Sequence, residues 1–199
     1  PFPLIQGIDV CGVIVDVGSN VDKKRVGQRV ILEPCLKYVN SQLMNPAHFL
    51  GSECNGGFAQ YTVVSTEHAH EIKSDYSDVE LASFPCSYST ALNLLTKANV
   101  SKDDVVLITG SSGGVGSAAI QLAKARNAKV IALTSPSKSD EIKQLGATEV
   151  IFRDEDVLKQ IDKNSVDVVI DLVGGEAFNS LLEALKPNGK YATSGAIAG

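Results

Sequence analysis

The sequence predicts an α/β protein in which a β-rich segment precedes a doubly wound parallel sheet. After about residue 85, short apolar runs alternate with segments of helical periodicity, a pattern typical of a parallel sheet covered on both faces. Before that point, alternating runs are separated by glycine and proline turns, which is typical of β structure. We therefore expect a β domain over residues 1–86 and an α/β domain over residues 87–199.

Alternation of small and apolar residues predicts three strands in the β domain. They cover residues 9–17, 29–32 and 58–64. The segment 33–54 shows no period and contains Pro34 and Pro46, so we expect a loop there.

The α/β domain begins with a predicted helix over residues 87–98, because Ala91, Leu95 and Ala98 share one helical face. Apolar runs then predict strands over 105–109, 129–133, 149–152, 166–171 and 190–194. Two apolar stripes between them predict helices that pack onto the sheet, one with Val115, Ala118, Ala119 and Leu122, the other with Phe178, Leu181, Leu182 and Leu185. A doubly wound domain usually has a sixth strand, which would lie beyond Gly199.

Composition narrows the class of protein. The net charge of -5 leaves no broad basic face, which argues against a nucleic-acid partner. No apolar run approaches the roughly 20 residues of a membrane helix, so we expect no membrane partner and a cytoplasmic location. The four widely spaced cysteines are expected to be reduced thiols. Because the chain starts at Pro1 and ends just after a predicted strand, we expect a fragment that lacks both ends.

A glycine-rich turn follows the strand over 105–109 and leads into a helix. At such a turn Gly113 lets the backbone approach a pyrophosphate, and Gly116 lets the helix pack closely against the strand. Glycine clusters also mark ordinary turns, but the strand-turn-helix context favours a dinucleotide site. The residues assigned to cofactor binding are Ser111, Ser112, Gly113, Gly114, Val115 and Gly116.

The next strand indicates which dinucleotide is bound. NAD-binding proteins typically end this strand with Asp or Glu, whose carboxylate binds the ribose hydroxyls. Here the strand ends without an acidic residue, and Thr134, Ser135, Ser137 and Lys138 follow. The serines can donate hydrogen bonds and Lys138 can supply a point charge, so we expect NADP(H) with these four residues at its extra phosphate. The alternative is that the serines only cap the following helix and Lys138 is solvated.

The chain resembles the medium-chain dehydrogenase/reductase superfamily, which combines a GroES-like β domain with a Rossmann domain. The resemblance is carried by residues 7–14, 26–30, 56–61, 110–124, 145–147 and 171–175. It implies that residues 1–86 are a partial GroES-like catalytic domain and that residues 87–199 are the NADP(H)-binding Rossmann domain. It also implies that Val173 belongs to the cofactor site and that two copies can associate through the edge of the Rossmann sheet.

Zinc enzymes of this superfamily read Gly-His-Glu where this chain has Gly7-Ile8-Asp9, and isoleucine cannot bind a metal. Their lobe of four close cysteines corresponds to residues 33–54, where only Cys35 and Cys54 occur. Cys86 lies where they place a third ligand, but a single thiolate is not a zinc site. We therefore expect no metal and interpret Cys86 as a small buried residue at the domain hinge.

The histidines do not supply a metal site either. His68 and His70 would point to opposite faces of one strand, and His48 stands alone.

The resemblance is thus to the zinc-free branch of quinone oxidoreductases and enone reductases. It implies that Thr90 and the strand end at Ser194-Gly195 lie beside the nicotinamide. Without a Lewis acid, hydride transfer favours an acceptor that spreads negative charge, such as a quinone or an α,β-unsaturated carbonyl. A hydroxyl of Tyr88 or Thr90 could stabilise that charge, and no general acid is identified.

Two other classes stay open. One is a zinc-dependent alcohol dehydrogenase with unusual ligands. The other is a non-catalytic protein that binds NADPH.

Overall fold

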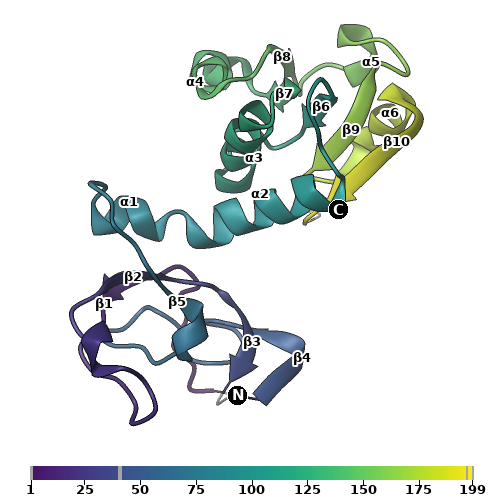
Figure 1. The fold of residues 1–199 in the computed structure, drawn as a ribbon. Helices are drawn as coiled ribbons and strands as arrows, with labels where there is room; N and C mark the ends of the chain where they lie inside the picture. Colours follow the sequence, from purple (N-terminus) through teal and green to yellow (C-terminus); the bar gives the residue numbers. More distant parts are fainter. Residues whose placement is uncertain (1, 40–41, 196, 199) are drawn as a thin grey trace. The chain divides into compact units, whose positions relative to one another are not determined.

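The computed structural model describes residues 2–39, 42–195 and 197–198. The chain forms two compact units, Pro1–Cys86 and Ser87–Gly199 (Figure 1). The elements along the chain are β1 (Cys11–Val13), η1 (Lys23–Arg25), β2 (Arg29–Leu32), β3 (Cys35–Val39), β4 (Gln42–Phe49), η2 (Thr66–His68), β5 (Ala69–Glu71), α1 (Asp78–Ala82), α2 (Pro85–Lys97), β6 (Val105–Ile108), α3 (Gly114–Ala125), β7 (Lys129–Thr134), η3 (Pro136–Lys138), α4 (Ser139–Leu145), β8 (Glu149–Phe152), α5 (Val157–Gln160), β9 (Val166–Asp171), η4 (Gly175–Ala177), α6 (Phe178–Ala184) and β10 (Leu185–Thr193).

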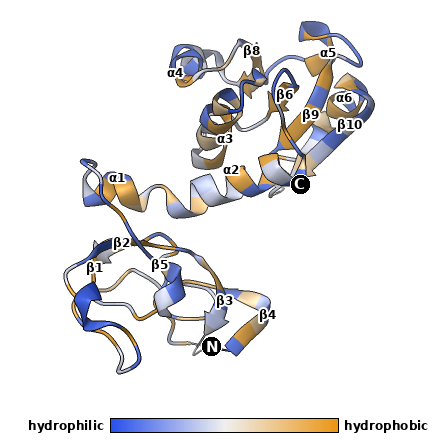
Figure 2. Ribbon diagram, viewed as in Figure 1, coloured by the Kyte–Doolittle hydropathy of each residue, from blue (hydrophilic) through white to orange (hydrophobic). Residues whose placement is uncertain are grey.

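The second unit is built on a parallel sheet with the strand order β10-β9-β6-β7-β8. Helices α3 and α4 cover one face and helices α5 and α6 the other (Figure 1). Because both faces are buried, β6 consists of apolar residues and β9 is apolar except for Asp167 and Asp171, and Figure 2 shows the apolar residues in orange. From β6 the chain runs outward to β7 and β8. It then returns to β9 on the other side of β6 and continues to β10, as in a doubly wound fold.

The predicted strands of this unit are confirmed. β8 and β9 have the predicted bounds, β6 ends one residue earlier, and β7 ends one residue later. β10 begins at Leu185 rather than at residue 190, with a shift in register between Leu185 and Lys190.

The helical stripe predicted on Phe178, Leu181, Leu182 and Leu185 is only partly correct. Leu181 and Ala184 are fully buried, whereas Phe178 is 44% and Leu182 is 41% exposed. The helix has seven residues, so its buried face holds only positions three apart.

The first unit contains a three-stranded antiparallel sheet with the order β1-β2-β5 and a separate hairpin of β3 and β4. Its core consists of Val30, Leu32, Leu36 and Leu50. The predicted strand over 29–32 is confirmed as β2, and the strand predicted over 9–17 shortens to β1.

Two predictions in this unit are wrong. The loop expected over 33–54 contains the β3–β4 hairpin, and Pro46 is tolerated because it lies where the register is irregular in a strand that pairs on one side only. The segment 58–64, expected to be a strand, begins with bends and has no strand pairing. Val63 is 93% exposed, whereas Thr62 and Val64 are half-buried and Val64 packs against the core of this unit. Alternation alone therefore did not indicate a paired strand.

Over the described ranges of the chain, none of the helices combines the length and the apolar character needed to cross a lipid bilayer.

Candidate functional site

The candidate site lies at the carboxyl end of β6, where the chain turns into α3. Gly110 has a φ of +56°, a conformation that favours glycine. A Cβ on Gly116 would lie 2.3 Å from the carbonyl oxygen of Gly110 and 2.6 Å from Cα of Ser111. The loop thus folds back onto the first turn of α3 with no room for a side chain.

The loop presents its main chain at the surface. Ser112, Gly113 and Gly114 are exposed, and Gly113 is the N-cap of α3 in extended conformation. The first N–H groups of a helix have no intrahelical acceptor and carry the positive end of its dipole. Such groups are typical binding sites for phosphates, and the assignment of this turn to the diphosphate of a dinucleotide stays a prediction.

The side chain of Ser111 has a different role from the exposed loop residues. It is fully buried, and its hydroxyl donates a hydrogen bond to the carbonyl oxygen of Leu133 at 2.8 Å. Ser111 therefore ties the loop to the end of β7, and only its main chain is available for a ligand.

A buried carboxylate at the end of β9 is hydrogen-bonded to residues of the neighbouring strands. Asp171 is 1% exposed and accepts hydrogen bonds from the hydroxyls of Thr109 and Tyr191 and from the N–H groups of Val173 and Gly174. Burial alone would raise the pKa of Asp171, but these hydrogen bonds together lower it below its ordinary value. The pKa of Tyr191 is raised, because burial and the neighbouring carboxylate both disfavour its anion.

This network joins the ends of β6, β9 and β10. It also holds Val173 beside the loop, where Cγ2 would be 3.1 Å from a Cβ on Gly110. The sequence assigns Asp171 only to a segment that carries the family resemblance. The available signal for its role was an acidic residue at the last position of a strand with the apolar run Val168–Ile170 before it.

The residues predicted to bind the extra phosphate of NADP(H) lie at or just after the carboxyl end of β7. Thr134 is 4% exposed, and its Oγ1 is buried without a hydrogen-bond partner. The hydroxyls of Ser135 and Ser137 lie 3.2 Å apart. Ser135 precedes η3 but makes no side-chain capping bond, so the alternative role of helix capping is not supported for Ser135.

Lys138 is engaged by a partner that sequence reasoning missed. Its Nζ lies 3.1 and 3.2 Å from the two carboxylate oxygens of Glu141, three residues ahead in the chain. Both side chains are substantially exposed, and such pairs typically contribute about 0–1 kcal/mol. Lys138 is therefore not the unpaired charge that the sequence suggested.

Sequence reasoning also missed Arg153. This residue directly follows β8, and its main-chain N–H donates a hydrogen bond to the carbonyl oxygen of Thr134 at 3.0 Å. Its position just after the strand that pairs with β7 was the available signal.

The candidate catalytic hydroxyls lie on α2. The hydroxyl of Tyr88 accepts a hydrogen bond from Nε2 of Gln121 at 2.9 Å, and its ring packs against the core. Thr90 is half-buried on the same helix.

The four cysteines, which all lie in the described part of the chain, are thiols and not members of disulfides, as predicted. Cys86 is half-buried rather than buried, because it lies in the first turn of α2. Its N–H donates to the carboxylate of Asp9 at 2.7 Å. Asp9 thus accepts a hydrogen bond at the start of α2.

The expectation that His68 and His70 point to opposite faces of one strand is wrong, because only His70 lies on β5. Both imidazoles approach Oε2 of Glu33, at 3.2 Å for His68 and 3.7 Å for His70. Nε2 of His68 accepts the N–H of Tyr38, so its Nδ1 carries the proton and donates to Glu33. Within the described part of the chain, no cluster of three or more His, Cys, Asp or Glu residues has metal-binding geometry.

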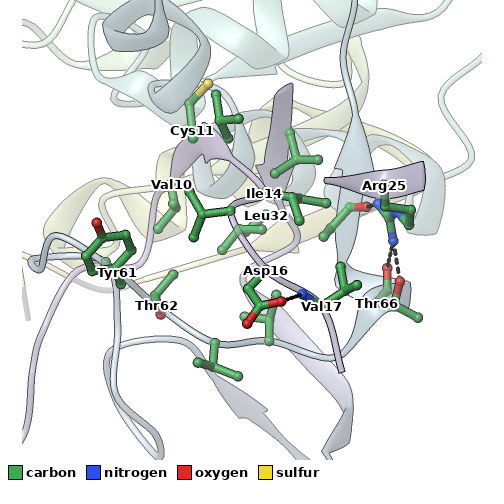
Figure 3. Close-up of a pocket in the computed structure, with 18 of the residues that line it drawn as sticks. Val10, Cys11, Ile14, Asp16, Val17, Arg25, Leu32, Tyr61, Thr62 and Thr66 are labelled. Atoms are coloured by element: carbon green, nitrogen blue, oxygen red, sulfur yellow. Dashed lines mark hydrogen bonds between the residues drawn. The ribbon is translucent and has the colours of Figure 1, made fainter. Parts of the chain in front are cut away.

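The first unit contains a pocket of about 510 Å³ between β1, β2 and the extended segment 57–66 (Figure 3). Val10, Ile14 and Leu32 give it an apolar lining. At its rim, Arg25 donates to the carbonyl oxygen and hydroxyl of Thr66. These polar contacts are structural, and the loop at the end of β6 does not line this pocket.

Each half of the chain matches a known family of protein domains. Residues 1–74 match the family model of the alcohol dehydrogenase GroES-like domain, and residues 114–199 match that of the zinc-binding dehydrogenase. A solved structure from Sinorhizobium meliloti 1021 is 42% identical with a TM-score of 0.92, over 100% of this chain and 56% of that one.

Three curated relatives cover most of this chain. The NAD-dependent alcohol dehydrogenase of Sulfolobus acidocaldarius is 30% identical over 100% of this chain and 61% of its own length. The acryloyl-coenzyme A reductase of Sulfurisphaera tokodaii is 32% identical over 98% and 61%. The quinone oxidoreductase of Sus scrofa is 29% identical over 95% and 54%.

The chain thus spans between 54% and 61% of the length of these relatives. The parallel sheet, the glycine-rich turn and both family models indicate the same superfamily. The chain belongs to the medium-chain dehydrogenase/reductase superfamily, with a GroES-like domain followed by a Rossmann-type domain.

Proposed function

We propose that the protein is an NADPH-dependent oxidoreductase that transfers hydride, without a metal, to a quinone or an α,β-unsaturated carbonyl. The observation that carries the proposal is the carboxyl end of β7, where residues 134–138 include no acidic residue. Ser135, Ser137 and Lys138 follow β7, and the main chain of Arg153 is hydrogen-bonded to Thr134. An acidic side chain here would bind the ribose hydroxyls of NAD and repel a 2′-phosphate.

The residues around the turn fit such a cofactor. Exposed main chain at Ser112–Gly114 faces the diphosphate position, and the absence of a Cβ at Gly116 keeps that turn tight. Thr134 Oγ1 is a buried hydroxyl that still needs a partner. When bound, the cofactor supplies the hydride, and the protein holds and orients it.

Ile8 bears on which class of molecule accepts the hydride. Isoleucine occupies the place of the zinc-ligating histidine, so the metal-binding set is incomplete in this chain. A conjugated acceptor spreads the charge left by hydride, and hydrogen bonds from hydroxyls such as those of Tyr88 and Thr90 can then stabilise it. The relatives that reduce acryloyl-coenzyme A and quinones support this class.

The test uses the full-length protein with NADPH, NADH and a panel of quinones and enones. We expect turnover of at least one acceptor with NADPH, and binding of NADPH at least tenfold tighter than NADH, which corresponds to about 1.4 kcal/mol. The proposal fails if no acceptor is reduced while alcohols are oxidised in a zinc-dependent way. Binding of NADPH without turnover would instead identify a non-catalytic protein.

A zinc-dependent alcohol dehydrogenase is the second candidate, favoured by the family model over residues 114–199 and by the relative from Sulfolobus acidocaldarius. Metal analysis of the purified protein separates the two. A stoichiometric zinc ion whose removal abolishes turnover supports this candidate.

Two copies are proposed to associate through the edge of the Rossmann sheet, with the last strands of this chain involved. Sedimentation analysis checks this, and a monomer at micromolar concentration would contradict it.

A further inference from the structure

We propose that Arg153, rather than Lys138, is the main residue that recognises the 2′-phosphate of the cofactor. This inference rests on the proposed use of NADPH. It assigns the specificity of that site to a residue on the neighbouring strand.

The position of Arg153 follows from the register of the sheet. Thr134 and Phe152 are paired at the ends of β7 and β8, and the N–H of Arg153 donates to the carbonyl oxygen of Thr134 at 3.0 Å. Ser135 and Arg153 are therefore the first residues beyond two paired strand ends. Neighbouring strands lie about 4.8 Å apart, so the long side chain of Arg153 can reach a group bound at Ser135.

Lys138 and Arg153, at the carboxyl ends of β7 and β8, differ in how closely each is paired with a carboxylate. Nζ of Lys138 is held by both oxygens of Glu141, so a phosphate has to compete with a carboxylate for it. Nε of Arg153 lies 3.8 Å from Asp154 Oδ1, which is longer than a hydrogen bond, and its side chain is 70% exposed. A guanidinium also binds a phosphate through two parallel N–H groups, which an ammonium cannot do.

Acidic residues surround Arg153 in the sequence and at the neighbouring strand end. Asp154 and Glu155 come directly after it, and Glu141 is paired with Lys138. Arg153 and Lys138 against these three carboxylates give a net charge of -1, which becomes -2 without Arg153. Removing Arg153 would therefore increase the repulsion of a phosphate dianion.

Thr134, which lies at this end of the sheet, has an unsatisfied hydroxyl. Among the described residues, none forms a hydrogen bond with its buried Oγ1, although buried hydroxyls nearly always have a partner. Thr134 lies between the serines on its own strand end and Arg153 on the next. A ribose or phosphate oxygen bound there would supply the missing partner.

The experiment measures the binding of NADPH and NADH to the full-length protein by nicotinamide fluorescence at fixed ionic strength. The variants are Arg153→Gln and Lys138→Gln, which each remove one positive charge from the same edge. We expect Arg153→Gln to weaken NADPH binding about tenfold or more and to leave NADH binding within about twofold. For Lys138→Gln we expect a loss of NADPH affinity of about threefold or less, because Glu141 already offsets its charge.

NADH serves as the internal control, because a folding defect would weaken both coenzymes equally. Equal losses for NADPH and NADH in Arg153→Gln would overturn the inference, and so would a larger effect of Lys138→Gln. If the wild-type protein prefers NADPH but Arg153→Gln keeps that preference, the inference fails and the proposed function survives. If the wild-type protein binds NADH at least as tightly, both fail.

Discussion

At the scale of single residues, the glycines of the phosphate loop have separable roles. A Cβ on Gly116 would overlap main-chain atoms of Gly110 and Ser111, which cannot move away as a flexible side chain could. A Cβ on Gly113 would meet only the Gly110 carbonyl oxygen, at the ordinary distance of 3.4 Å. One glycine is therefore needed for folding, and the other is expected to be needed for access to the diphosphate.

Replacing Gly116 by alanine is expected to lower the free energy of unfolding by about 2 to 3 kcal/mol, as overpacking against backbone does. The matched variant Gly113→Ala is expected to leave the free energy of unfolding within about 0.5 kcal/mol and to weaken NADPH binding. Urea unfolding and coenzyme titration measure the two effects. Equal stability of the two variants would contradict the assignment.

The carboxylate of Asp171 gives the protein a pH-dependent share of its stability. Its pKa is lowered in the folded state, so its contribution is present above the unfolded value of about 3.9 and is lost as the pH falls through the lower folded pKa. We expect Asp171→Asn to cost about 2 to 3 kcal/mol at pH 7, because a buried charged acceptor is lost. The difference from wild type should shrink toward pH 3.

Urea unfolding at several pH values checks this prediction. Asp140→Asn is the control, because Asp140 is exposed at the start of α4. A cost for Asp171→Asn that stays constant from pH 7 to pH 3 would show that its charge is not involved.

At the scale of elements, a buried histidine connects the hairpin of the first unit with η2. His68 is 2% exposed and accepts the N–H of Tyr38 in β3, while its other nitrogen donates to Glu33. The main chain of Glu33 in turn donates to the carbonyl oxygen of His68 at 2.8 Å. This explains a conspicuous histidine pair without any metal chemistry.

His68→Ala is expected to lower the free energy of unfolding by about 2 to 3 kcal/mol, since it leaves a cavity and an unpaired N–H at Tyr38. His70→Ala is the matched control, because His70 contacts the same carboxylate but is 56% exposed, and it should change stability by less than about 0.5 kcal/mol. Circular dichroism during urea unfolding measures both. Similar costs for the two variants would refute the structural role of His68.

At the scale of the whole molecule, the two units present different sites. The pocket of the first unit has an apolar lining, whereas the proposed nucleotide site of the second unit consists of loop main chain and strand ends. A ligand that binds only the folded state stabilises it in proportion to the logarithm of its concentration.

NADPH at about one hundred times its dissociation constant should stabilise the folded protein by about 2.7 kcal/mol and raise the melting temperature by about 5 °C or more. The same concentration of NADH should give a smaller shift. Thermal unfolding followed by circular dichroism measures both shifts, and a larger shift with NADH would contradict the proposed preference.

The sequence by itself determined the features that depend on neighbouring residues. The apolar strand β6, the helix stripe on α3 and the glycine-rich turn could be predicted, because burial on both faces and tight turns each require particular residue types locally. The absence of an acid after β7 was legible for the same reason.

Only the tertiary structure decided which side chains meet. Residues 58–64 alternate like a strand yet have no strand partner, while the residues around Pro46 form a strand because β3 pairs with them. Arg153 reaches the end of β7 through the sheet register, although 19 positions separate it from Thr134 in the printed sequence. Pairing and burial depend on contacts between distant segments, and local patterns carry little information about them.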